Sequence, residues 1–297
     1  MSRAKTQAAS DLTQGSIWKG MLQFFLPIML GTLLQQLYST VDSIVLGRFV
    51  GKTALGAVGG SNTAIINLLV GFFVGLASGA SVIIAQHYGA KEGRLVRRGV
   101  YTAIVLSVAI GALLTVVGIG SARALLTALA TPDDLMQYSM DYLQWYYAGM
   151  IPAMIYNMGS GILRAVGDSK RPLYFLAVCM LVNTVLDLFF VAVLRMEVKG
   201  AAIATSLSQL ICAVLVIRTL RRRDDSCCLR AEKHGFDWRL LGRMLAIGLP
   251  AGVQSTLYSI TNVFVQKAVN SLGSDTVAAW SAFWKLDGLF WPVSGAI

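Results

Sequence analysis

Two aspartates lie inside long apolar stretches of this sequence. Asp42 interrupts the stretch 33–46, and Asp187 interrupts the stretch 173–190. A charged side chain at membrane depth is costly, so such residues usually face the interior of a helix bundle and mark an ion or proton pathway. The alternative is a protonated aspartate that only makes a hydrogen bond between packed helices. We favour the ion pathway because both aspartates have polar neighbours.

Those polar neighbours recur at helical spacing. An α-helix turns once every 3.6 residues, so residues three or four apart share one face. The shared faces carry Gln35, Tyr38 and Asp42 in one segment, Asn183 and Asp187 in a second, and Thr205 and Gln209 in a third. If Arg48 and Arg195 lie near the outer surface, counting back along each helix places the two carboxylates roughly 9 and 12 Å below it. We therefore expect them to meet.

The groups predicted to meet are mostly oxygen donors. Two carboxylates, the Asn183 amide and the Thr205 hydroxyl, with the Tyr38 phenol beside them, suit Na⁺, which prefers hard oxygen ligands. They equally suit a proton, because two neighbouring carboxylates cannot both stay ionised at little cost. The sequence thus predicts a cation site for Na⁺ or H⁺ and no other cofactor.

Further polar or irregular positions occur within the apolar stretches. Pro27 removes a helical hydrogen bond and is interpreted as a hinge, with a static bend as the alternative. Asn62, Tyr156 and Asn157, together with Gln35 and Gln209, are predicted to line a substrate cavity.

Motifs typical of enzymes are missing from the sequence. There is no His-x-x-x-His metal pair, no glycine-rich phosphate loop followed by Lys-Ser or Lys-Thr, and no Gly-x-Ser-x-Gly elbow. We therefore do not expect an enzyme.

The composition predicts the elements that must position these groups. Of the 297 residues 56% are hydrophobic and 13% are charged, whereas soluble domains carry roughly 25% charged residues. The chain is therefore predicted to be an all-α, polytopic membrane helix bundle, since a spanning helix needs about 20 apolar residues. The four cysteines are expected to be reduced. The candidate spans are 18–47, 53–88, 99–128, 138–163, 172–194, 200–218, 244–270 and 276–297.

Basic residues accumulate in alternate connections, and most of all in the stretch 219–243. The positive-inside rule then places the N-terminus and this stretch in the cytoplasm. The net charge of +10 is explained by topology and by contact with lipid headgroups, so we do not expect nucleic-acid binding.

A weak internal repeat organises the segments. The seventh span resembles the first, with Leu249-Pro250 matching Leu26-Pro27. Six spans separate the copies, which predicts two lobes of the same orientation related by an axis along the membrane normal. The expected units are a cytoplasmic segment 1–16, a six-helix lobe 17–221, an interlobe loop 222–240 and a partial second lobe 241–297. The sequence stops inside an apolar stretch, which we interpret as a fragment.

With these features the chain resembles the multidrug and toxic compound extrusion (MATE) family, especially its DinF-like branch. The resemblance implies that the chain is truncated after about eight of twelve helices. The resemblance covers residues 11–297 and rests on the order and spacing of several short motifs. These are 11–18, Leu26-Pro27, Val41-Asp42-Ser43 with Leu46-Gly47-Arg48, 162–168, Asn183-Thr184-Val185-Leu186-Asp187 and 200–205.

The resemblance implies two six-helix lobes that rock to exchange cationic or amphiphilic drugs for H⁺ or Na⁺. It implies a multi-pass protein of the cell membrane, monomeric when full length. It places the cation site at Asp42, Asn183, Asp187 and Thr205, and the bend of the first helix at Pro27. The acidic residue that the NorM-like branch carries in helix seven is missing from the stretch 253–258. The alternatives are a lipid-linked oligosaccharide flippase, a membrane-embedded enzyme and a non-transporting fragment.

Overall fold

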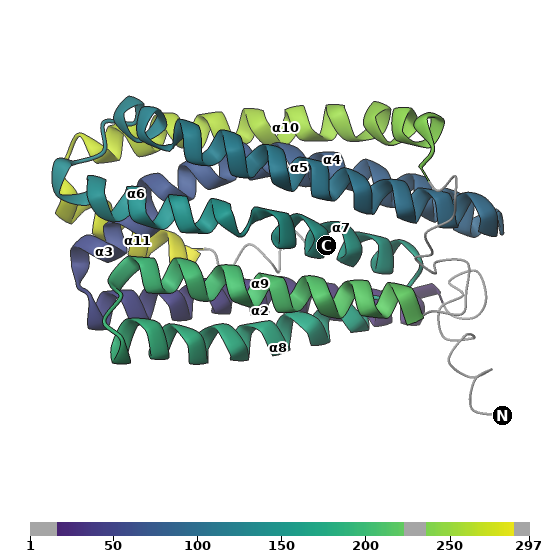
Figure 1. Ribbon diagram of the computed structural model, residues 1–297, viewed down its shortest axis with the longest axis horizontal. Coiled ribbons are helices and arrows are strands. Elements are labelled where there is room, and N and C mark those ends of the chain that lie inside the picture. The colour runs from purple at the N-terminus through teal and green to yellow at the C-terminus, as the bar shows by residue number, and fades with distance from the viewer. Residues whose placement is uncertain (1–16, 223–235, 288–297) are drawn as a thin grey trace.

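The computed structural model describes residues 17–222 and 236–287. The expected cytoplasmic segment 1–16, most of the interlobe loop and the end of the last predicted span lie outside these residues. Within the described ranges the chain is a bundle of long helices lying side by side (Figure 1). The helices are α2 (Ile17–Phe49), α3 (Lys52–Ala57), α4 (Thr63–Gly89), α5 (Gly93–Ala128), α6 (Asp133–Ala148), α7 (Met150–Ala165), α8 (Lys170–Asp187), α9 (Glu197–Arg222), α10 (Trp238–Asn270) and α11 (Ser274–Asp287), with π-helical turns η1 (Val58–Asn62) and η2 (Leu188–Val193).

Each predicted span corresponds to helix in the structure, so the prediction of a polytopic membrane bundle is confirmed. Four stretches of the described chain are long and apolar enough to cross a membrane, namely 52–89, 93–128, 170–193 and 197–222. The predicted fourth span, 138–163, is divided at Gly149 into α6 and α7. The predicted second span contains η1, inside which Gly60 has non-helical φ and ψ of −90° and −109°.

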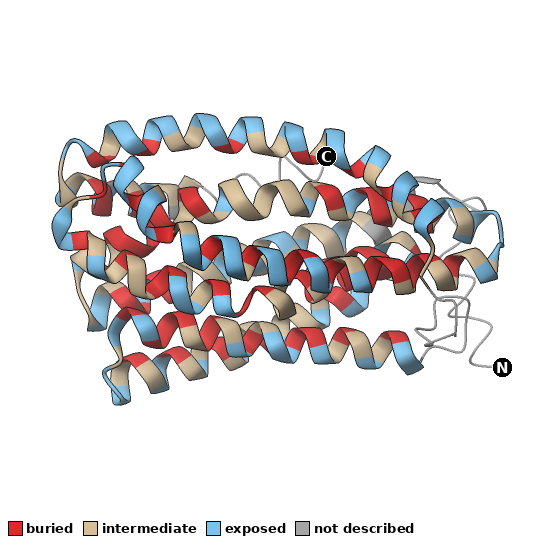
Figure 2. Ribbon diagram, turned by 45° about the horizontal axis from the view of Figure 1, so that its top comes forward, coloured by how far each residue is buried: buried red, intermediate tan, exposed pale blue. Residues whose placement is uncertain are grey.

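Burial follows the pattern of a bundle in lipid (Figure 2). Large apolar side chains such as Val116, Leu181 and Phe264 are about 70% exposed, at 72%, 68% and 70%. Such a surface suits contact with lipid hydrocarbon, because exposing an apolar side chain to lipid tails costs no free energy. Polar side chains including Asn183 and Asp187 are instead buried within the bundle.

The predicted start of the second lobe packs tightly on the first. α10 lies along α4, and a Cβ on Gly75 would come within 2.6 Å of the Cα of Gly252. Such backbone approach is typical of small residues between membrane helices. The N-terminus of α10 is capped by Asp237, whose Oδ1 accepts from the N–H groups of Arg239 and Leu240 at 2.9 and 3.2 Å.

Candidate cation site and cavity

Asn183 connects the two aspartates. Carboxylate oxygens accept hydrogen bonds, so the amide nitrogen of Asn183 must face them. In that orientation it donates to Asp42 Oδ1 at 2.7 Å and to Asp187 Oδ2 at 3.2 Å, and its oxygen accepts from the Tyr38 hydroxyl at 3.2 Å. The expectation that α2 and α8 bring these groups together therefore agrees with the geometry.

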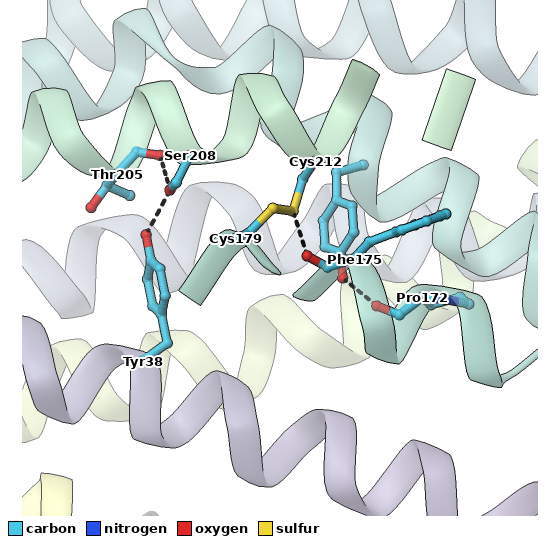
Figure 3. The surroundings of a disulfide bond; sticks show 8 residues. Tyr38, Pro172, Phe175, Cys179, Thr205, Ser208 and Cys212 are labelled. Atoms are coloured by element: carbon cyan, nitrogen blue, oxygen red, sulfur yellow. Dashed lines mark hydrogen bonds between the residues drawn. A yellow bond between two sulfur atoms is a disulfide. The ribbon is translucent and has the colours of Figure 1, made fainter. Parts of the chain in front are cut away.

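A second row of hydroxyl groups comes from α9. The Tyr38 hydroxyl lies 3.3 Å from Ser208 Oγ, and Ser208 Oγ donates to the carbonyl oxygen of Thr205 at 2.8 Å. Figure 3 shows Tyr38 reaching from α2 toward Ser208, with Thr205 one turn away on α9. Ser208 was not singled out from the sequence, although it lies three residues after Thr205 and shares its helix face.

The pair of carboxyl groups needs a positive charge. Asp187 is 0% exposed and Asp42 is 8% exposed, and the one Asn183 amide contacts both of their carboxyl groups. No N–H or hydroxyl group of the described residues donates to Asp187 Oδ1. A buried oxygen without a donor is costly, and it is suited to ligate a cation. Among the described residues there is no group of three or more His, Cys, Asp or Glu that could hold a metal ion.

A cavity of about 520 Å³ lies beside the site. Asp42, Tyr38 and Thr205 line it, whereas Asn183 and Asp187 are fully buried and do not line it. Of the predicted cavity residues, Gln35, Tyr156, Asn157 and Gln209 line it.

The assignment of Asn62 to the cavity was wrong. Asn62 is 0% exposed in η1 and does not line the cavity. Helical spacing alone could not reveal this, because η1 departs from the regular α-helical turn and so changes the direction in which its side chains point.

Sequence reasoning missed the aromatic walls of the cavity. Tyr142 and Tyr146 stack with ring centroids 5.7 Å apart, and Trp280 and Trp284 meet edge to face at 6.0 Å. Each pair has i, i+4 spacing, the signal that could have placed it on one helix face. Further cavity residues not predicted are Gln36, Ser39, Asn67, Tyr258, Asn262 and Gln266.

The expectation that all four cysteines are reduced was also wrong. Cys179 of α8 and Cys212 of α9 form a disulfide, with their sulfur atoms 2.07 Å apart (Figure 3). Their separation of 33 residues gave no local signal, because the pairing depends on how α8 and α9 pack. Cys227 and Cys228 lie outside the described residues.

Pro27 lies within α2, which stays helical on both sides of it. Its role as a hinge remains a prediction.

Comparison with known proteins places this site in a family. The family model MatE matches residues 27–189, a range that contains Asp42, Asn183 and Asp187. The chain belongs to the MatE family. Because this is a family of transporters, the prediction that the chain is not an enzyme is confirmed.

Relatives of the MatE chain are named as multidrug resistance proteins. It is 32% identical to the probable multidrug resistance protein YpnP of Bacillus subtilis over 95% of its own length and 62% of the relative's. It is 30% identical to YoeA of the same organism, over 89% of this chain and 58% of the relative. The MatE chain thus spans less than two thirds of the length of these relatives.

Solved structures of the family share the fold. An outward-facing multidrug resistance MATE transporter matches with a TM-score of 0.85 and 25% identity, over 97% of this chain and 64% of the other. An inward-facing one matches with a TM-score of 0.80 and 24% identity, over 92% and 63%. The DinF-like branch and the number of further helices remain predictions.

Proposed function

We propose that the chain works as a secondary active multidrug efflux antiporter, or as the larger part of one, with the coupling ion bound at Asp42 and Asp187. The observation that carries the proposal is the Asn183 amide joining two buried carboxylates beside a cavity. The relatives named as multidrug resistance proteins support the same activity.

Coupling follows from charge. With H⁺ or Na⁺ bound, the carboxylate pair has lost part of its negative charge and attracts a cationic substrate less. Without the ion, Asp42 presents net negative charge to the cavity, where a cation is attracted strongly because little water screens it. Ion and cationic substrate thus compete for one wall, which is the condition for exchange.

The cavity suits amphiphilic cations. The tyrosine and tryptophan pairs offer apolar contact and cation–π attraction, and Gln35, Asn157 and Gln209 offer polar contacts. Among the described residues that line the cavity there is no Lys or Arg. A lipid-linked oligosaccharide flippase, whose substrate carries phosphate, would favour basic groups there, so we prefer the antiporter.

Membrane, orientation, oligomeric state and partners complete the proposal. The chain is proposed to lie in the cell membrane with its N-terminus in the cytoplasm, in agreement with the distribution of basic residues. Its lobes rock around the Pro27 hinge, it works as a monomer when full length, and its partners are the exported molecule and the bilayer.

Export from proteoliposomes tests this function. With an inward gradient of H⁺ or of Na⁺, the protein should move a fluorescent organic cation, and Asp42→Asn or Asp187→Asn should abolish the coupled movement. Both variants should still insert in the membrane. Asp141→Asn, which removes a carboxylate paired with Lys199 at 3.5 Å outside the site, serves as the matched control. Full coupled transport by either site variant would refute the assignment.

A further inference from the structure

A buried hydrogen-bond network lies where the end of α10 meets η1 and the segment between α5 and α6. Asn270 Nδ2 donates to Ser61 Oγ at 2.9 Å and to the carbonyl oxygen of Leu129 at 2.8 Å. Thr131 Oγ1 donates to the same Ser61 oxygen at 3.0 Å. Asn270, Ser61 and Thr131 are 3%, 1% and 6% exposed. Parts of the chain far apart in sequence thus hold one amide in place.

This network decides which atom of the Gln266 amide is held by Asn270. A backbone carbonyl only accepts, so the nitrogen of Asn270 must point to Leu129 and its Oδ1 must point away. Asn270 Oδ1 accepts from Gln266 Nε2 at 2.8 Å. The nitrogen of Gln266 is therefore engaged with Asn270, and its Oε1 atom is left for another partner.

Gln266 is part of the cavity wall. The residue lines the cavity together with Gly60, Trp280 and Trp284, although only 5% of it is exposed. Its Nε2 atom lies 3.3 Å from where a Cβ on Gly60 would be, so the amide rests against the backbone of η1. No described residue donates to Oε1. A nearly buried, oriented carbonyl oxygen with no donor among the described residues is suited to accept a hydrogen bond from a ligand.

We propose that Gln266 Oε1 accepts a hydrogen bond from an N–H group of the transported cation, and so selects protonated amines over quaternary cations. The inference rests on the proposed function and specifies its substrate class. A protonated amine donates a charge-assisted hydrogen bond, which is stronger than a neutral one. A quaternary ammonium or phosphonium has no N–H group and gains nothing from this oxygen. Asn270 acts as a positioning residue, because it fixes the amide without touching the substrate.

Competition binding with a matched pair of amines tests the proposal. Labelled tetraphenylphosphonium, which lacks N–H, is bound to the purified protein and displaced by 4-phenylbutylammonium or by its trimethylammonium analogue. Gln266→Met should weaken the primary amine by about tenfold, the usual scale for one hydrogen bond to a charged group. Binding of tetraphenylphosphonium and of the trimethyl analogue should change by less than about twofold.

Two further variants separate the role of the oxygen from general damage. Asn270→Leu removes the orienting partner and should cause a partial loss confined to that amine. Gln254→Met is the matched control, because Gln254 is an exposed residue of α10 that does not line the cavity, and it should bind all three cations as the wild type does.

The outcomes separate a failure of the Gln266 assignment from a failure of the proposed function. If Gln266→Met weakens all three cations equally, or leaves the primary amine unchanged, the assignment of Gln266 is overturned while the proposed function stands. If the wild type binds none of the three, the proposed function fails and the assignment of Gln266 fails with it. A loss in Gln266→Met that is confined to the primary amine, with Gln254→Met binding as the wild type does, supports the inference.

Discussion

Replacement of Asp187 by asparagine should make the stability of the folded protein independent of the coupling ion. In the wild type, Asp187 is 0% exposed and its Oδ1 has no donor among the described residues, so the folded state needs a cation or a proton there. Asparagine removes this negative charge and offers an N–H group toward Asp42. The folded variant no longer gains from the ion, although the fold is preserved.

The size of the effect follows from binding to the folded state alone. A ligand at 100 times its dissociation constant stabilises that state by about 2.7 kcal/mol. For a chain of this size, 1 kcal/mol moves the thermal midpoint by about 2 °C. The wild type should therefore gain about 5 °C between the absence of the ion and saturation, and Asp187→Asn should gain less than about 1 °C.

Thermal unfolding of the purified protein in detergent measures this difference. One series varies Na⁺ at fixed pH, and a second lowers the pH without Na⁺, so the series in which the midpoint rises identifies the ion. For a proton the sign is fixed, because the folded state holds the proton and its stability falls as the pH rises. The Asp141→Asn control should behave as the wild type. An Asp187→Asn variant that keeps the full 5 °C gain would refute the cation site.

Three more changes test other features of the chain. Pro27→Ala should slow transport by at least tenfold and keep the ion-dependent gain in thermal midpoint, as fluorescent-cation efflux and unfolding would report; unchanged efflux would exclude the hinge. Replacing Cys179 and Cys212 by alanine should lower the free energy of unfolding by up to about 4 kcal/mol, the entropy scale of a loop of 33 residues. In the wild type, thiol alkylation should label two fewer cysteines without reductant than after reduction. Gly75→Leu should force α4 away from α10 and lower the free energy of unfolding by about 1–3 kcal/mol or more. Gly89 has open space around it, so Gly89→Ala should change the free energy of unfolding by less than about 1 kcal/mol in the same assay.

The long helices and much of the candidate site could be predicted because both depend on local periodicity. Helical spacing placed Asn183 beside Asp187 and Tyr38 beside Asp42, and the counted depth along each helix brought the two pairs together. These inferences needed only regular helices that cross the same bilayer.

The features that escaped prediction depend on irregular turns or distant contacts. Asn62 belongs to the π-helical turn η1 and does not line the cavity. The hydrogen bond between Asn270 and Ser61 joins residues 209 apart, and the Cys179–Cys212 disulfide requires the packing of α8 on α9. None of these follows from hydrophobic pattern, because the pattern does not specify which helices become neighbours.

The arrangement of the two aspartates has a consequence for how the coupling ion acts on the substrate. Asp42 lines the cavity, whereas Asp187 has no exposed surface and does not line it. In the proposed exchange, a cationic substrate meets Asp42 but does not reach Asp187. An ion bound at the carboxylate pair therefore acts on the substrate through the charge that Asp42 presents to the cavity, and the buried carboxylate can control substrate binding without touching the substrate.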